Sequence, residues 1–225
     1  MVALYWVRLM TNDQHPPRRT RLTQKDRQSA ATKARLLEAA RRLFREYGYH
    51  DVSVTEIARE AGVTHAMINA HFHSKAGLLY ELIHENNDVQ IAALEAGLPD
   101  EGSTMERLRW ILAMYAKYDL EDTQLMAVMQ AYYWQWPRET EDRNRAQLLQ
   151  ALSPIARILR EDADLQNVDE AEIETLIDAI YAIYTFGLRP AVYRDASPES
   201  CVDAIMHRVG MLLDGARLQA RGGGA

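Results

Sequence analysis

The stretch from Ser53 to Lys75, SVTEIAREAGVTHAMINAHFHSK, most constrains what this chain can fold into, because it predicts two short helices joined by a tight turn. Ser53 stands three residues before Glu56, the spacing of a capping box at a helix start. Apolar residues then recur on one helical face: Val54, Ile57, Ala58 and Ala61. Gly62 follows, and glycine closes a helix in the left-handed conformation at the least steric cost.

A second short helix is expected over residues 65–71, capped by Thr64, with Val63 filling the turn before it. Its buried side is expected to consist of Met67, Ile68 and Phe72. Ser74 is then expected to cap a third helix. Two short helices around a glycine turn are the layout of a helix-turn-helix, whose second helix enters the major groove of DNA.

The segment AGVTHAMINAHFHSKAGLL resembles the signature of the TetR (tetracycline repressor) family of transcription regulators. The matching elements are Gly62-Val63-Thr64, His71-Phe72, Ser74-Lys75 and Leu78-Leu79. Upstream, LLEAARRLFREYGYHDVSV is similar to the first helix of that family and its Gly-Tyr exit. The resemblance covers residues 33–82, and beyond them the sequence indicates only helical architecture.

The resemblance implies which residues of this domain meet DNA. They are Val54, Thr64, His65, Ala66, Met67, Asn69, Ala70, His71 and Lys75. Thr64 and residues 65–67 are expected in the groove, with Asn69, His71 and Lys75 at phosphates, since phosphate contacts fix the register and base contacts specify the sequence. Two residues depart from the family pattern. Asn69 stands where many members have a tyrosine, and Ala70 where an aromatic residue is frequent.

Charge is distributed unevenly along the chain, whose net charge is −6. Residues 1–50 contain eleven Lys and Arg against four Asp and Glu, a net +7, and residues 1–90 still carry +3, which leaves −9 for the rest. A positive front and a negative rear suit a protein that presents one end to a polyanion. Residues 1–28 are expected to form a flexible basic arm. The arm is either a solvated tail or a segment that places Arg18 and Arg19 on the DNA backbone or in the minor groove.

The fold class predicted for the whole chain is all-α, with no period-2 strands. A helix over residues 29–47 has one apolar face, and residues 29–85 are expected to form a three-helix DNA-binding domain with its motif at 54–73. A helix from Ser74 to about residue 96 joins it to a second helical domain over residues 86–221. Further helices are expected from residue 103, at 123–136, at 138–160 with a kink or break at Pro154, at 169–188 and at 198–220.

The resemblance implies that the second domain binds a ligand and forms a homodimer through its last two helices, at about 169–188 and 198–220. Both helices carry more apolar surface than one packing partner needs, although an ordinary core is the alternative interpretation. Dimerisation has a physical purpose, because one short helix contacts few bases, whereas a two-fold pair contacts a palindromic operator on double-stranded DNA.

The helix at 123–136 is apolar almost all round, so it is expected to be buried or to line a cavity. The predicted apolar effector pocket consists of Trp110, Met114, Tyr118, Met126, Met129, Tyr133, Trp134 and Phe186. Such residues suit small ligands, and they equally suit plain core. The expected effector is a small apolar or aromatic molecule that lowers DNA affinity.

Other classes of function find little support in the sequence. No nucleophile–base pattern, glycine-rich phosphate loop or HExxH motif is present, so an enzyme is not expected. His71 and His73 lack companion ligands, and neither a metal nor a cofactor is expected. The single cysteine, Cys201, fits a reducing cytoplasm. No apolar run approaches the roughly 20 residues of a membrane span. Residues 1–10 are too short for a signal peptide, and Met10 is an alternative start.

A dimeric, ligand-responsive repressor is therefore the favoured interpretation of the sequence. The alternatives are a DNA-tethered module that binds a protein instead of a small molecule, and, less favoured, a helical enzyme.

Overall fold

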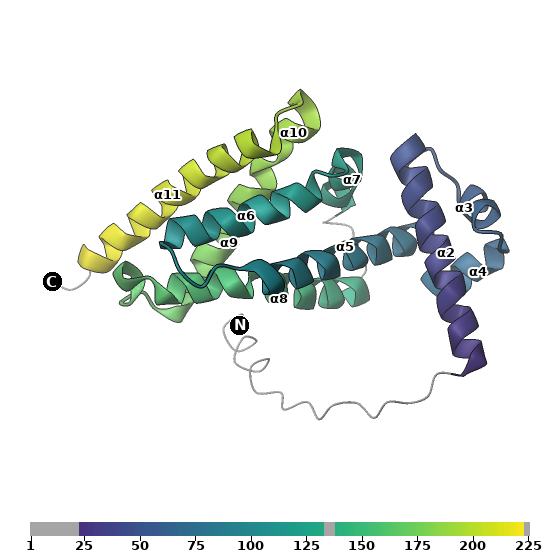
Figure 1. Cartoon of the computed structure of the whole chain (residues 1–225), viewed down its shortest axis with the longest axis horizontal. Coiled ribbons are helices and arrows are strands. Elements are labelled where there is room, and N and C mark those ends of the chain that lie inside the picture. The colour runs from purple at the N-terminus through teal and green to yellow at the C-terminus, as the bar shows by residue number, and fades with distance from the viewer. Residues whose placement is uncertain (1–22, 133–137, 223–225) are drawn as a thin grey trace.

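The computed structural model describes residues 23–132 and 138–222, and this part of the chain is helical with no strand (Figure 1). The predicted all-α class is confirmed. The helices are α2 (Gln24–Tyr47), α3 (Val54–Glu60), α4 (His65–Phe72), α5 (Lys75–Gly97), α6 (Thr104–Asp119), α7 (Thr123–Tyr132), α8 (Arg138–Glu161), α9 (Glu170–Gly187), α10 (Arg189–Arg194) and α11 (Pro198–Gly222), with one 3-10 turn, η1 (Ala163–Leu165).

The buried apolar side chains form two separate cores. The front core joins α2, α3, α4 and the first half of α5, and its fully buried members include Leu36, Ile57, Ile68, Leu78 and Leu79. The rear core joins α6, α8, α9 and α11, and includes Leu108, Ile111, Ile155, Leu159, Ile180 and Ile205. Helix α5 belongs to both, because Leu94 near its end packs in the rear core. Figure 1 shows α5 as a rod that leads from the α2–α4 end into the rear helices.

The domain boundary predicted at residues 85 and 86 falls inside this continuous helix. The two domains therefore share a rigid element in place of a linker, and the exact boundary stays a prediction.

Helix α2 begins five residues earlier than the predicted start at residue 29. Thr23 caps it, because its hydroxyl accepts from the Asp26 N–H at 3.2 Å and its own N–H donates to the Asp26 carboxylate at 2.9 Å. Residues 24–28, predicted as part of the flexible arm, are thus helical. Residues 23–31 are all exposed, so no apolar periodicity marked this first part of the helix.

Helix α7 lies between the two cores and is not buried on all sides, but Met126 and Met129 line a cavity, which is the second of the two outcomes that the sequence predicted. Only Met126 is fully buried, in the rear core. The other large apolar side chains pack against the front core: Leu125, Val128, Met129 and Tyr132. The apolar surface on several sides of α7 therefore serves two neighbours. The predicted extension to residue 136 lies outside the described residues.

Helix α8 runs through Pro154 without dividing. Proline has no N–H to donate to the carbonyl four residues earlier, which here belongs to Gln150. The hydroxyl of Ser153 donates to that carbonyl at 2.8 Å instead. The neighbouring side chain thus donates to the carbonyl that proline leaves without a donor; the predicted break does not occur, and the predicted kink stays a prediction.

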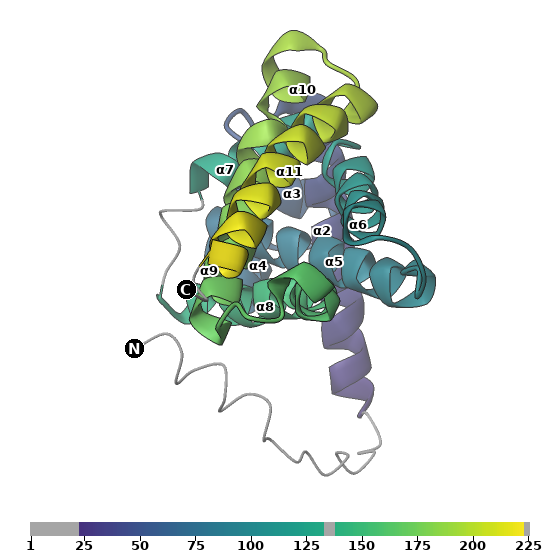
Figure 2. The ribbon, with the colours of Figure 1, turned by 90° about the vertical axis from the view of Figure 1, so that its left-hand side faces the viewer.

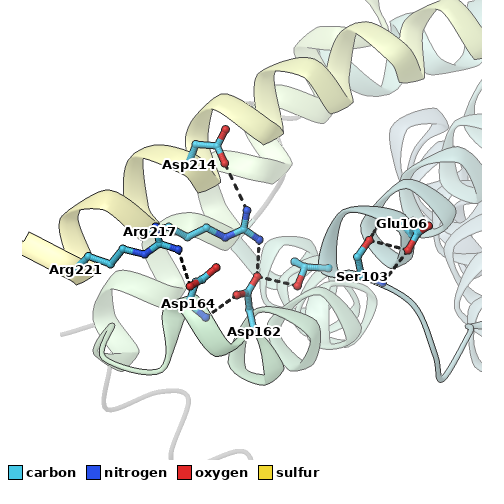
Figure 3. A network of polar contacts seen from close by, with 8 residues as sticks. Ser103, Glu106, Asp162, Asp164, Asp214, Arg217 and Arg221 are labelled. Carbon is cyan, nitrogen blue, oxygen red and sulfur yellow. Dashed lines mark hydrogen bonds and ion pairs between the residues drawn. The ribbon is translucent and has the colours of Figure 1, made fainter.

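A polar network joins the far end of α11 to α6 and η1 (Figure 3). The buried carboxylate of Asp162 accepts from the Arg217 guanidinium at 2.6 Å and from the Thr104 hydroxyl at 2.7 Å. Arg221 also donates to Asp164 at 2.8 Å. Viewed along the molecule, α11 crosses the rear bundle near its surface, with α9 beside it (Figure 2). The network fixes one end of that surface helix.

Candidate nucleic-acid interface and effector cavity

The turn between α3 and α4 has the predicted geometry. The Ser53 hydroxyl accepts from the Glu56 N–H at 3.2 Å, and the Ser53 N–H donates to the Glu56 carboxylate at 2.8 Å, which completes the capping box. Gly62 has a φ of +63°, the left-handed conformation expected of it. The Val63 N–H then donates to the Ala58 carbonyl at 3.0 Å. The Gly62 conformation and the Val63 contact set the angle at which α4 leaves α3, whereas the capping box fixes the start of α3.

Helix α4 buries one narrow face, formed by Ile68 at 0% and Phe72 at 3% exposure, as predicted. Met67 was also predicted to be buried, but it is 38% exposed. Adjacent positions on a helix point about 100° apart, so Met67 faces away from the pair Ile68 and Phe72, which are four residues apart. Thr64 occupies the N-cap with extended backbone, yet its side chain makes no capping hydrogen bond, which corrects the prediction for that hydroxyl.

The structure brings most of the predicted DNA-binding residues onto one open surface. The exposed members belong to the α3–α4 turn and α4: Thr64, His65, Ala66, Met67, Asn69 and Ala70. Val54, His71 and Lys75 are half-buried at its margin. Arg18 and Arg19 lie outside the described residues.

Lys75 begins α5 beside this surface. Its ammonium lies 4.3 Å from the centroid of the Tyr49 ring and 3.4 Å from the His50 carbonyl oxygen. Burial lowers the pKa of Lys75, and the nearby carboxylates of Asp51 and Glu56 oppose that shift. The ammonium is therefore held in place at a helix N-terminus, the end of a helix that attracts anions.

Two arginines on the polar side of α2, Arg41 and Arg42, are paired with carboxylates. Arg41 contacts Glu38 and Glu85 at 3.0 and 2.8 Å, and Arg42 contacts Glu60. Their charges are already balanced within the chain, so these side chains serve the packing of α2 against its neighbours more directly than contact with an external anion.

A cavity of about 120 Å³ lies inside the rear domain, where α5, α6, α7, α8 and α9 meet. Met126 and Met129 line it, as the sequence predicted. Trp110 instead packs against Gly97, Met114 packs in the rear core, and Tyr118 lines a groove between α2, α5 and α7. Phe186 is 68% exposed and is not part of the lining. Tyr133 and Trp134 lie outside the described residues.

The cavity has a polar centre that the sequence did not reveal. The carboxylate of Asp119, at the end of α6, accepts from the Gln90 side-chain amide and from the Tyr184 hydroxyl, each at 2.6 Å. Asp119 lines the cavity and is half-buried. Burial therefore raises the pKa of Asp119, although both donors oppose the shift. Burial and the adjacent carboxylate likewise raise the pKa of Tyr184.

Two other kinds of site receive no support from the described residues. Within them, no three His, Cys, Asp or Glu side chains are grouped so as to hold a metal ion. None of the helices in that part of the chain is long and apolar enough to cross a bilayer.

Comparison with known proteins points to one family. Residues 36–82 match the family model of bacterial regulatory proteins, tetR family. The chain is 27% identical over 95 residues to the fatty acid metabolism regulator protein of Bacillus subtilis (strain 168), a match that covers 42% of this chain and 49% of that protein. It is also 27% identical over 97 residues to an HTH-type transcriptional regulator of Staphylococcus aureus (strain USA300), covering 43% and 52%. The chain thus spans about half the length of the curated relatives it matches.

Solved structures share the fold over most of the chain. The transcriptional regulator FadR from Bacillus subtilis in complex with stearoyl-CoA superimposes with a TM-score of 0.64 at 21% identity, covering 78% of this chain and 96% of that one. The regulator PfmR from Thermus thermophilus gives a TM-score of 0.58 at 24% identity, covering 80% and 97%.

Proposed function

We propose that this chain, which belongs to the TetR family of bacterial regulatory proteins through residues 36–82, is a dimeric transcription regulator that binds a palindromic operator and releases it when a small ligand enters the rear cavity. The observation that supports DNA binding best is the exposed face of α4 beside the ammonium of Lys75. Such a protein acts in the bacterial cytoplasm, where the DNA lies.

On this proposal, Thr64 and residues 65–67 enter the major groove. The hydroxyl of Thr64 makes no capping bond within α4, so it is available to a base or phosphate. Asn69 and His71 on α4 and Lys75 on α5 bind phosphates on the flanking strands, because an ammonium and free backbone N–H groups converge at the start of α5. Val54 and Ala70 lie at the edges of the contact, and Arg18 and Arg19 precede it in the chain.

The dimer interface is proposed on α9 and α11. Large apolar side chains are exposed on these helices, including Phe186 at 68%, Met211 at 65% and Leu218 at 68%. Exposed apolar surface of this kind marks protein interfaces. A two-fold pair would place its α4 helices in successive major grooves about 34–36 Å apart.

Helix α7 provides a physical route from the cavity to the front core, in which α4 also packs. Met129 lines the cavity and also packs against the front core, and the Tyr132 ring lies 5.3 Å from the ring of Tyr49. The cavity is smaller than the roughly 300–1,000 Å³ of typical ligand pockets, so a ligand larger than about one aromatic ring must widen it and displace α7. Coupling between two sites of this kind is typically about 1–3 kcal/mol.

The cavity favours a small-molecule effector over the alternative of a DNA-tethered protein-binding module, which needs no internal space. The stearoyl-CoA complex of the Bacillus subtilis regulator supports the same choice, since that protein shares the fold.

The test is fluorescence anisotropy with a duplex that the full-length chain selects from a random library. The Lys75→Ala variant should bind about tenfold more weakly, because a charged phosphate contact is lost, and its salt dependence should be shallower. Lys117→Ala, which removes an exposed charge on α6, is the matched control and should bind as the parent chain does. Equal affinity of both variants would contradict the proposed interface.

A further inference from the structure

The cavity contains a carboxylate without a cation. Asp119 has two neutral donors, Gln90 and Tyr184, and none of the described residues that line the cavity is Lys, Arg or His. An ionised carboxylate is costly to remove from water unless a positive charge is nearby. A carboxylate offers about four acceptor positions, and the two neutral donors occupy two of them. The carboxylate of Asp119 is therefore able to accept further hydrogen bonds, and positively charged donors would stabilise its negative charge most.

Three tyrosine rings line the same cavity as this carboxylate. The rings of Tyr115 and Tyr184 lie 6.4 Å apart, edge to face, and Tyr181 completes this side of the lining. The Tyr115 hydroxyl donates to the Ala151 carbonyl at 2.8 Å, which fixes the orientation of its ring. Aromatic faces attract cations, and most strongly where water is excluded. The carboxylate and the aromatic rings therefore both favour a positively charged ligand.

We infer that the effector is a cation: a compact ammonium group on an apolar body about the size of one aromatic ring, docked with its charge against Asp119. The size follows from the cavity, since an engineered apolar cavity of about 150 Å³ holds one benzene, and this one measures about 120 Å³. The inference rests on the proposed function, because it names the ligand class of the same cavity.

The contact with Gln90 connects this ligand to DNA binding. Gln90 is 6% exposed and belongs to α5, the helix that begins at the DNA-binding surface with Lys75. An ammonium that donates to the open acceptor positions of Asp119 draws negative charge away from the Gln90 amide and weakens its hydrogen bond. Weakening of the 2.6 Å bond from Gln90 loosens a tie between α5 and the end of α6, which allows α5 to shift with the ligand in place.

A cationic effector would also distinguish this chain from the Bacillus subtilis regulator FadR, whose structure contains stearoyl-CoA. A ligand carboxylate or phosphate placed beside Asp119 would meet a like charge in a site of low polarity, where repulsion is only weakly screened. An anionic effector should therefore bind poorly at this position.

The experiment compares three single-ring probes that differ in charge: 2-phenylethylammonium, neutral 2-phenylethanol and anionic phenylacetate. Binding to the full-length chain is measured by titration calorimetry. The ammonium probe should bind most tightly, and Asp119→Asn should weaken it about tenfold to a hundredfold, as expected when a charge-assisted bond is lost. The variant should leave the affinity for 2-phenylethanol nearly unchanged.

Asp178→Asn is the matched control, because it removes the same charge from an exposed position on α9. It should not change the affinity for the ammonium probe. Thermal melting of each variant shows whether the fold is retained, and if Asp119→Asn fails to fold, the comparison of the three probes on the parent chain remains decisive.

The inference is overturned if the ammonium probe binds no better than the alcohol, if phenylacetate binds best, if no probe binds, or if Asp119→Asn and Asp178→Asn behave alike. None of these results affects binding to the selected duplex, which is measured separately without a probe. Release of that duplex by phenylacetate or stearoyl-CoA would uphold the proposed regulator while refuting the cationic effector.

Discussion

Gly77 offers the sharpest test of how α4 is positioned, because it lies where the start of α5 passes the end of α4. A Cβ atom at this position would lie 1.9 Å from the carbonyl oxygen of Phe72, a backbone atom that no rotamer change can move. Ordinary carbon–oxygen contacts begin at about 3.3 Å, so Gly77→Ala must separate the two helices by about 1.4 Å.

The magnitude follows from two opposing effects. Overpacking of this kind lowers the free energy of unfolding by about 1–3 kcal/mol, whereas the higher helix propensity of alanine raises it by up to about 1 kcal/mol. We therefore expect Gly77→Ala to lower the free energy of unfolding by about 1–2 kcal/mol. The free energy of DNA binding should change by more than the free energy of unfolding does, because a recognition site must be held within about 0.5 Å of its working position.

Chemical denaturation and anisotropy with the selected duplex measure the two effects. Gly210→Ala is the matched control, because its added Cβ meets only the Met105 side chain, at 3.5 Å, inside α11. The control should gain about 0.5–1 kcal/mol from helix propensity and keep its DNA affinity. If Gly77→Ala is as stable as Gly210→Ala, or binds DNA as the parent chain does, the geometry of the α4–α5 corner is not what positions the recognition helix.

Two further changes test the rear domain. Burial raises the pKa of the Asp162 carboxyl, but the hydrogen bonds from Arg217, Thr104 and the Asp164 N–H outweigh it, so the pKa lies below the usual value. Its stabilising effect is thus present above the usual pKa of an aspartate and is lost as the pH falls through the lower, folded-state pKa. Asp162→Asn should lower the free energy of unfolding, measured in urea at neutral pH, by about 1.5–3 kcal/mol. The difference between the variant and the parent chain should narrow as the pH falls below about 4, and a difference that persists in acid would refute this. Leu218→Glu should convert the dimer to monomer in sedimentation experiments and weaken DNA binding, because a charge replaces exposed apolar surface, whereas Gln219→Glu, its exposed neighbour, should stay dimeric. A dimer that survives Leu218→Glu would place the interface elsewhere.

Local signals in the sequence predicted much of the fold. The capping box at Ser53 lies within four residues of chain and forms as expected, and the helix expected from residue 103 begins with a box of the same kind at Ser103. The left-handed Gly62 also depends only on its own backbone. The box at Thr23 was missed because exposed polar residues follow it, so the apolar periodicity that marked the other helices was absent.

The cavity was harder to predict because its polar centre is assembled from distant parts of the chain. Gln90 and Asp119 are 29 residues apart, and Tyr184 lies 65 residues beyond Asp119. An aspartate at a helix end is ordinarily solvated, so nothing in its local sequence indicated burial. The predicted pocket residues were chosen for apolar character alone, which does not separate cavity lining from core or from exposed surface such as Phe186.

The same ambiguity explains Met67. It was assigned to a buried face by spacing, yet its side chain is 38% exposed. Helical periodicity defines a face only to within about one residue, and short helices such as α4 leave little sequence over which to average.

Sequencing of the duplexes that the full-length chain selects from a random library, with the mass of each complex measured in solution, tests the central claim most directly. We predict an inverted repeat whose half-sites are one helical turn or a multiple apart, bound by an even number of chains. Recovery of no enriched sequence, or of an asymmetric site bound by a single chain, would contradict it.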